Sequence, residues 1–332
     1  MTDKKVVLVA GGAGYIGSHA CKALFENGYT PVTYDNLEFG HEWAVRWGPF
    51  EYGDIHDKDR LSEVLDQYRP IAVLHFAAYA YVGESVENPL KYYRNNVSGT
   101  LTLLEIMREK NIEKLVFSST CATYGDPVQD YISESHPQDP INPYGSTKLM
   151  VEKILQNMER AHGLKSISLR YFNAAGADAD SEIGEAHDPE THLIPLALEA
   201  AIGMREPLTI FGDDYDTPDG TCIRDYIHVT DLANAHVSAL KQLERGGSTA
   251  CYNLGIGQGY SVFEVVDAIK RVTGREVPHH IGSRRVGDPP SLVADSSNFC
   301  SEMDWTPEFS DLDTIVDTAW RWLQVNPERK RT

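Results

Sequence analysis

A tyrosine and a lysine four residues apart stand in the run Tyr144-Gly-Ser-Thr-Lys148, near the middle of the chain. On a helix, residues at this spacing share one face, so the ammonium group of Lys148 can lie near the phenol of Tyr144. A neighbouring positive charge favours phenolate and lowers a pKa that is about 10 in an unperturbed tyrosine. We therefore expect Tyr144 to act as a general base near neutral pH. In isolation the spacing also fits an exposed tyrosine and a solvated lysine, so the position of the helix must decide.

The hydroxyl residue Thr120 directly follows the apolar run 115–119, which we predict to be a strand. In an open parallel sheet, ligands bind beyond the carboxyl ends of the strands. The helix that begins near Tyr144 precedes the next predicted strand, so its first turn is expected at the same edge of the sheet. This position favours a catalytic group made of Thr120, Tyr144 and Lys148.

A glycine-rich turn, Gly11-Gly-Ala-Gly14-Tyr-Ile-Gly17, joins the first predicted strand to the first predicted helix. Glycines let the chain turn tightly and let a pyrophosphate approach the backbone, while the helix N-terminus supplies amide donors and a favourable dipole. An ordinary strand-to-helix turn is the alternative, and the position of the motif argues against it. The turn therefore predicts a dinucleotide site.

Asp35 ends the second predicted strand, 18 residues after Gly17. An acidic side chain about 20 residues beyond such a turn binds the adenosine ribose, and its charge repels a 2′-phosphate. No Arg or Lys lies between Val32 and Gly40, so we expect the cofactor to be NAD and not NADP. Asp54, after the third predicted strand, fits two interpretations: a contact to the adenine edge, or a solvated residue before a helix.

Strand-length apolar runs alternate with helical segments through the first half of the chain, which is typical of a parallel sheet built from βαβ units. We predict an α/β fold, a Rossmann-like doubly wound parallel sheet with a smaller mixed α/β C-terminal substrate lobe. The NAD-binding domain is expected at 1–173, with a segment near 224–243 returning to it, and the substrate lobe mainly at 174–332. Predicted strands lie at 6–10, 32–34, 50–52, 72–76, 114–118 and 166–171, and predicted helices at 15–27, 57–68, 89–110 and from 144 onward.

The 332 residues include 30 Lys and Arg against 49 Asp and Glu, a formal net charge of −19. An acidic surface repels phosphate backbones and anionic lipid, so we expect neither a nucleic-acid nor a membrane partner. The five cysteines lie far apart without a C-x-x-C pair, so neither a disulfide framework nor a metal site is expected. No apolar stretch approaches the roughly 18 residues of a spanning helix, and the leader is too short for a signal sequence. We expect a soluble, cytoplasmic protein.

Further motifs extend these features into a resemblance to the UDP-glucose 4-epimerase family, in the extended branch of the short-chain dehydrogenase/reductase superfamily. The motifs span the chain in order: Asp35-Asn36, His75-Phe-Ala-Ala78, Val82-Gly-Glu-Ser85, Tyr93-Arg-Asn-Asn-Val97, Ser118-Ser-Thr-Cys-Ala-Thr-Tyr-Gly125, Asn142-Pro-Tyr144, Arg170-Tyr-Phe-Asn173, Arg224-Asp-Tyr-Ile-His228 and Tyr252-Asn-Leu-Gly255. The resemblance implies an isomerase that keeps NAD tightly bound. Such an enzyme inverts C4 of a UDP-sugar by oxidation to a 4-ketosugar, rotation of the ketosugar, and return of the hydride.

Individual roles also follow from the resemblance. It implies that Tyr144 deprotonates the sugar 4-hydroxyl, that Thr120 hydrogen-bonds the same oxygen, and that Lys148 also binds the nicotinamide ribose. The cofactor-binding residues that it implies are Gly11, Gly14, Tyr15, Ile16, Gly17, Asp35, Asn36, Asp54, Ile55, Phe76, Ala77, Ala78, Asn95, Lys148 and Phe172. The substrate-binding residues that it implies are Thr120, Tyr144, Asn173, Leu193, Arg224, Arg285, Asp288 and Leu292. A homodimer formed by the helices 89–110 and 144–161 is implied as well.

The identity of the sugar is open at this level. UDP-glucose and UDP-galactose are the expected pair, and UDP-xylose and UDP-arabinose are the alternative, because a hydroxymethyl group is worth only about 1–3 kcal/mol in a pocket. Leu292 stands where the family bounds the space near the sugar, which leaves acceptance of N-acetylated sugars open. Thr120 replaces the Ser of many relatives, Ala80 replaces a Lys of some, and His192 replaces an Asn of some. We assign His192 no chemical role.

Two other classes of protein compete with the epimerase interpretation. A nucleotide-sugar 4,6-dehydratase of the same branch places an acidic pair directly after the Ser or Thr, whereas this chain has Cys121-Ala122, which cannot exchange the required protons. A non-catalytic NAD(H)-binding sensor does not need the catalytic group. Retention of Thr120, Tyr144 and Lys148 favours an enzyme.

Overall fold

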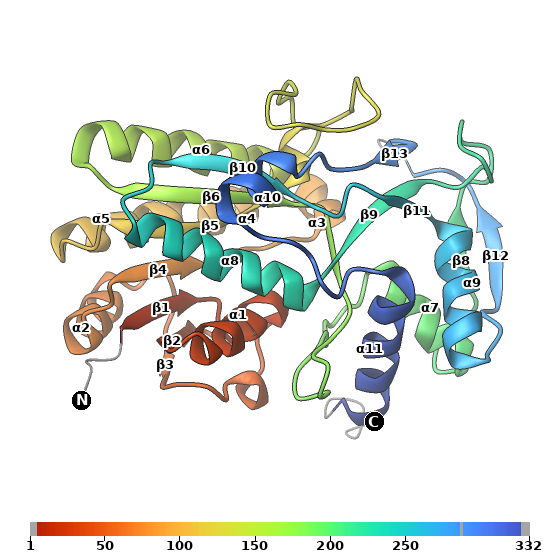
Figure 1. The fold of residues 1–332 in the computed structure, drawn as a ribbon, viewed down its shortest axis with the longest axis horizontal. Coiled ribbons are helices and arrows are strands. Elements are labelled where there is room, and N and C mark those ends of the chain that lie inside the picture. Colours follow the sequence, from red (N-terminus) through yellow and green to blue (C-terminus); the bar gives the residue numbers. More distant parts are fainter. Residues whose placement is uncertain (1–4, 286–287, 327–332) are drawn as a thin grey trace.

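The computed structural model describes residues 5–285 and 288–326. Its centre is a sheet of seven parallel strands in the order β10-β6-β5-β4-β1-β2-β3 (Figure 1). The strands are β1 (Val6–Ala10), β2 (Thr30–Asp35), β3 (Phe50–Tyr52), β4 (Ala72–His75), β5 (Lys114–Thr120), β6 (Lys165–Tyr171) and β10 (Ala250–Leu254). The strand order reverses between β1 and β4, which is the switch point where doubly wound sheets bind ligands. The predicted Rossmann-like fold is confirmed.

Both faces of the large sheet are covered, which explains why its strands are continuously apolar. Along β1 the side chains alternate between two cores, with Val9 in one and Leu8 in the other. The first core includes α1 (Tyr15–Glu26) and α8 (Val229–Glu244). The second includes α2 (Lys58–Tyr68), α5 (Thr100–Glu109) and α6 (Pro143–His162).

The helix predicted over 89–110 is interrupted. It consists of α4 (Pro89–Tyr92), a π-helical turn (Tyr93–Gly99) and α5. Asn96 on this turn is buried and fixes it against neighbouring segments: its Nδ2 donates to the Tyr79 carbonyl at 3.0 Å and to Thr147 Oγ1 of α6 at 3.1 Å. Such turns occur frequently at functional sites, and sequence periodicity did not reveal this one.

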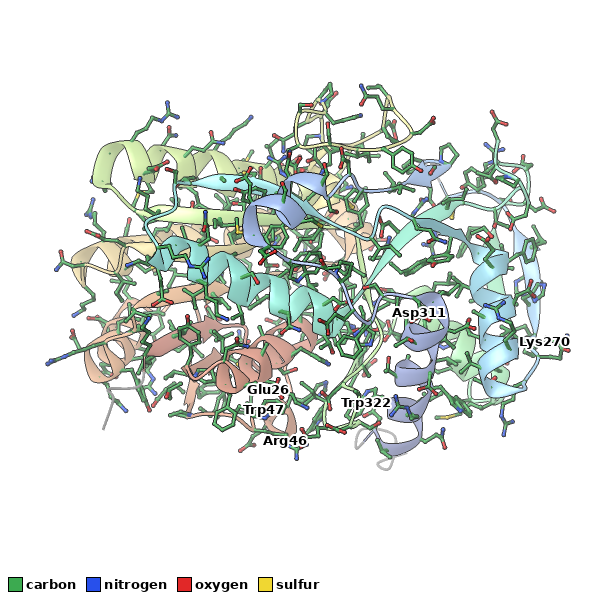
Figure 2. The ribbon with its side chains drawn as sticks, in the orientation of Figure 1. Glu26, Arg46, Trp47, Lys270, Asp311 and Trp322 are labelled. Atoms are coloured by element: carbon green, nitrogen blue, oxygen red, sulfur yellow. The ribbon has the colours of Figure 1, made fainter. Side chains whose placement is uncertain are left out.

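The second lobe is smaller and mixed. Its strands β7 (Asn173–Ala175), β9 (Ile223–His228), β11 (Gly259–Ser261) and β13 (Ser291–Leu292) form one sheet, and β8 (Leu208–Phe211) and β12 (His279–Gly282) form another. The helices α7 (Leu193–Ala201), α9 (Val262–Thr273) and α11 (Leu312–Val325) share its core. Figure 2 shows Lys270 on α9, and Asp311 and Trp322 at the two ends of α11.

Local signals place these helix ends. A capping box begins α9, because Ser261 Oγ accepts from the Glu264 amide at 3.1 Å and the Glu264 carboxylate accepts from the Ser261 amide at 2.7 Å. Asp311 caps α11 by accepting from the Thr314 amide at 2.9 Å. These caps fix the start of the two helices that close the second lobe.

The chain then returns to the large sheet. After β9 it forms α8, which lies against α1, and then β10, which pairs with β6 at the edge of the sheet (Figure 1). The remaining helices are α3 (Val82–Glu87), α10 (Ser297–Met303) and the short 3-10 helices Glu42–Ala44 and Cys121–Thr123. Across the described ranges, no helix combines the length and apolar character needed to cross a membrane.

Candidate active site

The glycine-rich turn packs tightly on one side and is open on the other. A Cβ on Gly11 (φ +81°) would lie 2.5 Å from the Ala77 amide nitrogen, and a Cβ on Gly17 would lie 2.1 Å from the Gly11 carbonyl. Gly14, the N-cap of α1, has only the Gly11 carbonyl oxygen near it, at 3.4 Å from such a Cβ. No side chain of residues 5–285 or 288–326 caps α1, so its first amides are available to an anion, which fits a dinucleotide pyrophosphate.

Asp35 is fixed at the carboxyl end of β2, beside the glycine-rich turn. Its Oδ2 accepts from the Ala13 amide at 3.0 Å and its Oδ1 accepts from the Leu37 amide at 2.8 Å. Next to it, Asn36 Nδ2 donates to Asp54 Oδ2 at 2.9 Å. Burial raises the pKa of Asp35, and the two amide hydrogen bonds oppose this rise. A fixed carboxylate in this place fits the ribose of NAD, as the spacing predicted, and the role of Asp54 stays a prediction.

The segment after β4 forms the opposite wall of the turn. The amides of Phe76 and Ala77 both donate to the Ala10 carbonyl of β1, at 2.7 and 3.0 Å. Asn95 lies on the π turn, where its Nδ2 donates to Asn96 Oδ1 at 3.1 Å. The other implied cofactor residues take structural positions: the Tyr15 hydroxyl donates to the Gly176 carbonyl at 2.7 Å, Ile16 packs on the first core, Ile55 lies within the second core, and Ala78 continues the segment after β4.

Thr120, Tyr144 and Lys148 meet where β5 ends and α6 begins. Asn142 caps α6 by accepting from the Gly145 amide at 2.8 Å. Lys148 is buried, with its Nζ 2.7 Å from the Ser118 carbonyl that accepts its hydrogen bond and 5.8 Å from the centre of the Tyr144 ring. Thr120 lies close enough to the Tyr144 hydroxyl to lower the pKa of the phenol. The predicted catalytic group is thus assembled from residues 28 positions apart in the chain.

The pKa of Tyr144 does not behave as the spacing suggested. Burial, together with the neighbouring Tyr171, raises the pKa of the Tyr144 phenol well above its ordinary value, and the hydrogen bond from Thr120 offsets only part of this rise. Burial also lowers the pKa of Lys148 to about 7, against the opposing charge of Glu152. In the protein alone, the desolvation of both groups therefore outweighs their mutual attraction. The expectation of a lowered tyrosine pKa was wrong for this state.

A buried ion pair that sequence reasoning missed holds α6 against the sheet. Arg170 of β6 donates from Nε and Nη2 to the two carboxylate oxygens of Glu152, at 2.9 and 2.7 Å. Ser119 Oγ also donates to Glu152, and the third Arg170 nitrogen donates to the Tyr124 hydroxyl at 2.9 Å. Glu152 follows Lys148 by four residues, so a shared helix face was the available signal. This network positions the lysine by fixing its helix.

The residues implied for the substrate lie around β9 and on its neighbours. Arg224 forms an ion pair with Asp288 and is mostly buried. Leu292 of β13 pairs in register with Arg224, and Asn173 Nδ2 donates to the Asp225 carbonyl at 3.1 Å. These residues therefore gather on one small sheet.

The remaining implied residues take other positions. Phe172 shares a small apolar cluster with Cys121 and Leu292, which links the cofactor side to the substrate side. The guanidinium of Arg285 lies 4.0 Å from the centre of the Phe211 ring, and Leu193, the first residue of α7, packs on the core of the second lobe. The ion pair and the strand register thus bring Asp288 and Leu292 to Arg224.

Comparisons with known proteins agree with this geometry. The NAD dependent epimerase/dehydratase family matches residues 7–255. A UDP-glucose 4-epimerase of Rhizobium leguminosarum bv. trifolii is 52% identical over 318 residues, which cover 96% of this chain and 97% of that protein. The crystal structure of UDP-glucose 4-epimerase from Brucella ovis in complex with NAD has a TM-score of 0.94 and 56% identity, covering 96% of this chain and 98% of that chain.

A more distant relative has the same fold. The crystal structure of UDP-glucose-4-epimerase from Stenotrophomonas maltophila, with bound NAD and formylated UDP-arabinopyranose, has a TM-score of 0.95 and 38% identity, covering 99% of this chain and all of that chain. These similarities confirm the resemblance that the motifs indicated. The chain belongs to the NAD dependent epimerase/dehydratase family.

Proposed function

We propose that this protein is an NAD-dependent isomerase that interconverts UDP-glucose and UDP-galactose by inverting C4 of the sugar. One observation carries the proposal: the hydroxyl groups of Thr120 and Tyr144 lie close together beside the buried amino group of Lys148, at the sheet edge that also holds the glycine-rich turn. The similarity to UDP-glucose 4-epimerases along nearly the whole chain supports the same activity.

The cofactor is NAD. Solved relatives hold NAD, and this chain has an open helix N-terminus at Gly14 and a fixed carboxylate at Asp35. When bound, NAD supplies the hydride acceptor for the sugar C4. The chain contributes the walls of the site, with the backbone of Phe76 and Ala77 against Gly11 of the glycine-rich turn.

The chemistry of the chain itself is proton transfer. As the sugar C4 loses a hydride, its 4-hydroxyl loses a proton to the phenolate form of Tyr144, and the C4–O single bond becomes a carbonyl. Tyr144 must therefore lose its own proton before the step, which requires that the positive charges of Lys148 and of the nicotinamide, when NAD is bound, offset the effect of burial on the phenol. Thr120 donates to the same sugar oxygen and holds it in place. When the hydride returns to the other face of C4, Tyr144 gives the proton back. Burial raises the pKa of the phenol, so the neutral phenol holds this proton firmly while the ketosugar turns.

Arg224 and Arg285 are proposed to bind the UDP diphosphate. A guanidinium group pairs with two phosphate oxygens at once, which a lysine cannot do. Asp288 pairs with Arg224 in the structure and keeps its charge compensated before the substrate arrives. Leu292 pairs with Arg224 across the small sheet, so it would lie close to the bound nucleotide.

A dehydratase is disfavoured by the residues after Thr120. Burial raises the pKa of the Cys121 thiol to about 12, so this side chain stays neutral at physiological pH. Ala122 has no titratable group. Elimination of water from the ketosugar needs an acid and a base near the neighbouring carbons, and this pair supplies neither.

The substrate is tested by incubating the purified protein separately with UDP-galactose and UDP-xylose and resolving the products. We expect UDP-glucose from UDP-galactose, at a rate that exceeds formation of UDP-arabinose from UDP-xylose. Exclusive turnover of the pentose would overturn the hexose assignment and leave C4 epimerisation intact. Formation of a dehydrated sugar from either substrate would overturn epimerisation itself.

We further propose a homodimer formed through α4, the π turn, α5 and α6. Three large apolar side chains on these helices are exposed, Leu90, Leu101 and Met150, at 64%, 42% and 43% of their surface. A second copy packed there would remove them from water. Sedimentation of a monomer at assay concentration would contradict the dimer.

A cytoplasmic location is proposed as well, because all five cysteines are free thiols.

A further inference from the structure

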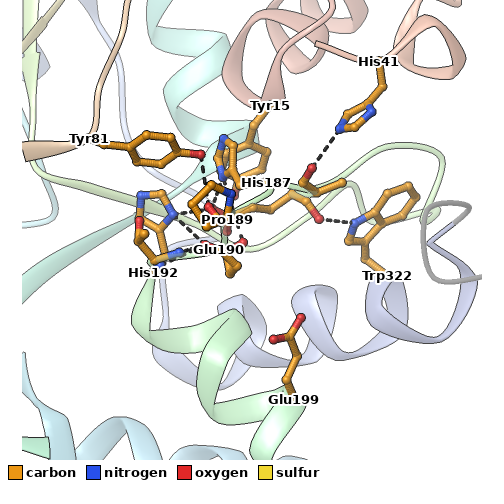
Figure 3. A network of polar contacts seen from close by, with 12 residues as sticks. Tyr15, His41, Tyr81, His187, Pro189, Glu190, His192, Glu199 and Trp322 are labelled. Atoms are coloured by element: carbon orange, nitrogen blue, oxygen red, sulfur yellow. Dashed lines mark hydrogen bonds and ion pairs between the residues drawn. The ribbon is translucent and has the colours of Figure 1, made fainter. Parts of the chain in front are cut away.

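Four side chains of metal-binding type converge on the segment between β7 and α7, in the run Glu185-Ala-His-Asp-Pro-Glu-Thr-His192. One ligand atom from each of Glu185, His187, Glu190 and His192 lies within 4.8 Å of all the others. Figure 3 shows His187, Glu190 and His192 directed toward one another. The predicted site residues do not include this group, and the proposed proton transfer does not use it.

The distances are compatible with one small cation at the centre. His192 Nδ1 lies 2.6 Å from Glu185 Oε1 and 3.0 Å from Glu190 Oε1, and His187 Nδ1 lies 2.9 Å from Glu185 Oε1 and 4.0 Å from Glu190 Oε2. Ligand atoms about 2.0–2.2 Å from a tetrahedral zinc ion are separated from each other by about 3.3 Å. Three of the four separations are shorter than that value because the atoms are paired with each other, so a bound ion would replace these contacts and move the ligand atoms apart.

The backbone that carries these ligands is fixed from outside the segment. Trp322 Nε1 donates to the Glu185 carbonyl at 2.8 Å, His41 Nε2 contacts the Ala186 carbonyl at 2.8 Å, and the Tyr81 hydroxyl donates to the Pro189 carbonyl at 3.1 Å (Figure 3). Three side chains from separate parts of the chain thus hold one short loop. A preorganised ligand set binds a metal without first ordering a loop.

Two of the four ligands are buried carboxylates. The side chains of Glu185 and Glu190 are only 6% and 7% exposed, and among the described residues their ion pairs are with His187 and His192 alone. The other titratable groups beside them are the Tyr15 and Tyr81 phenols, Asp188 and the buried His19. Burial lowers the pKa of His19 to about 4, so none of these groups supplies a positive charge at neutral pH. Two buried carboxylates therefore match a divalent cation held with two neutral imidazoles.

We propose that Glu185, His187, Glu190 and His192 bind one zinc ion. Imidazole and carboxylate ligands suit zinc, and four protein ligands without an open position are typical of a structural site, not a catalytic one. The ion would tie this segment to itself where the His187 ring packs against Tyr15 of α1, with ring centres 6.0 Å apart. It would therefore stabilise the junction between the glycine-rich turn and the second lobe, whether or not the proposed sugar chemistry is correct.

The test measures zinc binding to the full-length protein without an affinity tag. The protein is stripped with a chelator, dialysed against zinc alone, and assayed for metal content and for its melting temperature. We expect one zinc per chain and a higher melting temperature with zinc, because a ligand that binds only the folded state stabilises it. His187→Ala should weaken zinc affinity at least about tenfold and lose the thermal shift.

His280→Ala is the matched control. His280 is an exposed histidine on β12 that contacts only Thr209 among the described polar groups, so its variant should bind zinc like the parent protein. Far-ultraviolet circular dichroism shows whether His187→Ala is folded, and Glu190→Gln provides a second test if it is not. Absence of stoichiometric zinc in the parent protein overturns the proposal. So does unchanged affinity in both ligand variants, or a thiolate-to-metal absorption band with cobalt, which would assign the metal to cysteine.

Discussion

The catalytic corner, formed by Thr120, Tyr144 and Lys148 at the end of β5, and the arginines of the second lobe hold their basic groups in opposite ways. Lys148 is buried against a backbone carbonyl, and no carboxylate in the described ranges forms an ion pair with it, because Glu152 is engaged by Arg170. Arg224 is paired with Asp288. Burial without a carboxylate partner makes the charged form of Lys148 unfavourable, so this group can exchange a proton near neutral pH. Asp288, in contrast, compensates the charge of Arg224 until an anionic ligand binds.

The comparison predicts different kinetic effects for the two regions. Changes in the catalytic corner act on proton transfer and lower kcat, whereas changes among the arginines act on binding of the nucleotide and raise KM. The predictions below begin with the largest effect.

Tyr144→Phe removes the proton acceptor and leaves the ring in place. We expect kcat for UDP-galactose to fall about 10³-fold, because a positioned general base contributes about 10²–10⁴-fold. Tyr131→Phe, at a tyrosine that is 58% exposed, is the control and should keep full activity. Steady-state assays of both variants measure kcat. An unchanged kcat for Tyr144→Phe would show that Tyr144 is not the general base.

Thr120→Val keeps the shape of the side chain and removes its hydroxyl. We expect kcat to fall about 10²-fold, because the sugar oxygen and Tyr144 lose a shared hydrogen-bond partner. Thr120→Ser restores a hydroxyl and should recover most of the rate. Equal rates for the valine and serine variants would show that the hydroxyl has no part in catalysis.

Arg224→Lys keeps the charge and loses the planar pair of donors. We expect KM for UDP-galactose to rise about tenfold with little change in kcat, because a lysine cannot bind two phosphate oxygens in the same way. Arg321→Lys, on the surface of α11 and paired with Asp317, should leave both constants unchanged. A fall in kcat at constant KM would mean that Arg224 acts on the chemical step and not on binding of the nucleotide.

The smallest predicted effect is on stability. Burial lowers the pKa of Lys148 from 10.5 to about 7, so between pH 7.5 and 9.5 the unfolded chain binds a proton that the folded protein does not. The free energy of unfolding then rises with pH in this window, by up to about 1.4 kcal/mol per unit. Relative to Lys148→Met, the parent protein should gain about 1–2 kcal/mol. Urea unfolding of both proteins at the two pH values tests this, and parallel pH dependences would contradict it.

Local sequence patterns predicted where several candidate site residues lie in the fold. The glycine-rich turn, Asp35 and the start of α6 each depend on residues close together in the chain, with a strand end or a helix cap to place them. The edge of a parallel sheet then brings distant strand ends together, which is why Thr120 was found from its position alone.

Other parts depend on tertiary packing that spacing does not encode. The ion pair of Arg170 and Glu152, the π turn that carries Asn96, and the convergence of His187 on Glu185 are visible only in the folded chain. The prediction of a lowered Tyr144 pKa failed for the same reason. The depth of burial, and not the four-residue spacing, sets the direction of the pKa shift. Sequence reasoning was therefore weakest for charged groups whose surroundings are set by tertiary structure.

The most direct test of the central claim follows the hydrogen at C4. UDP-galactose with deuterium at C4 is converted by the purified protein in ordinary water, and the product is analysed by mass spectrometry and nuclear magnetic resonance. The proposed removal and return of one hydride within a closed site predicts UDP-glucose that retains the deuterium at C4. Replacement of that deuterium by hydrogen from solvent would contradict the account.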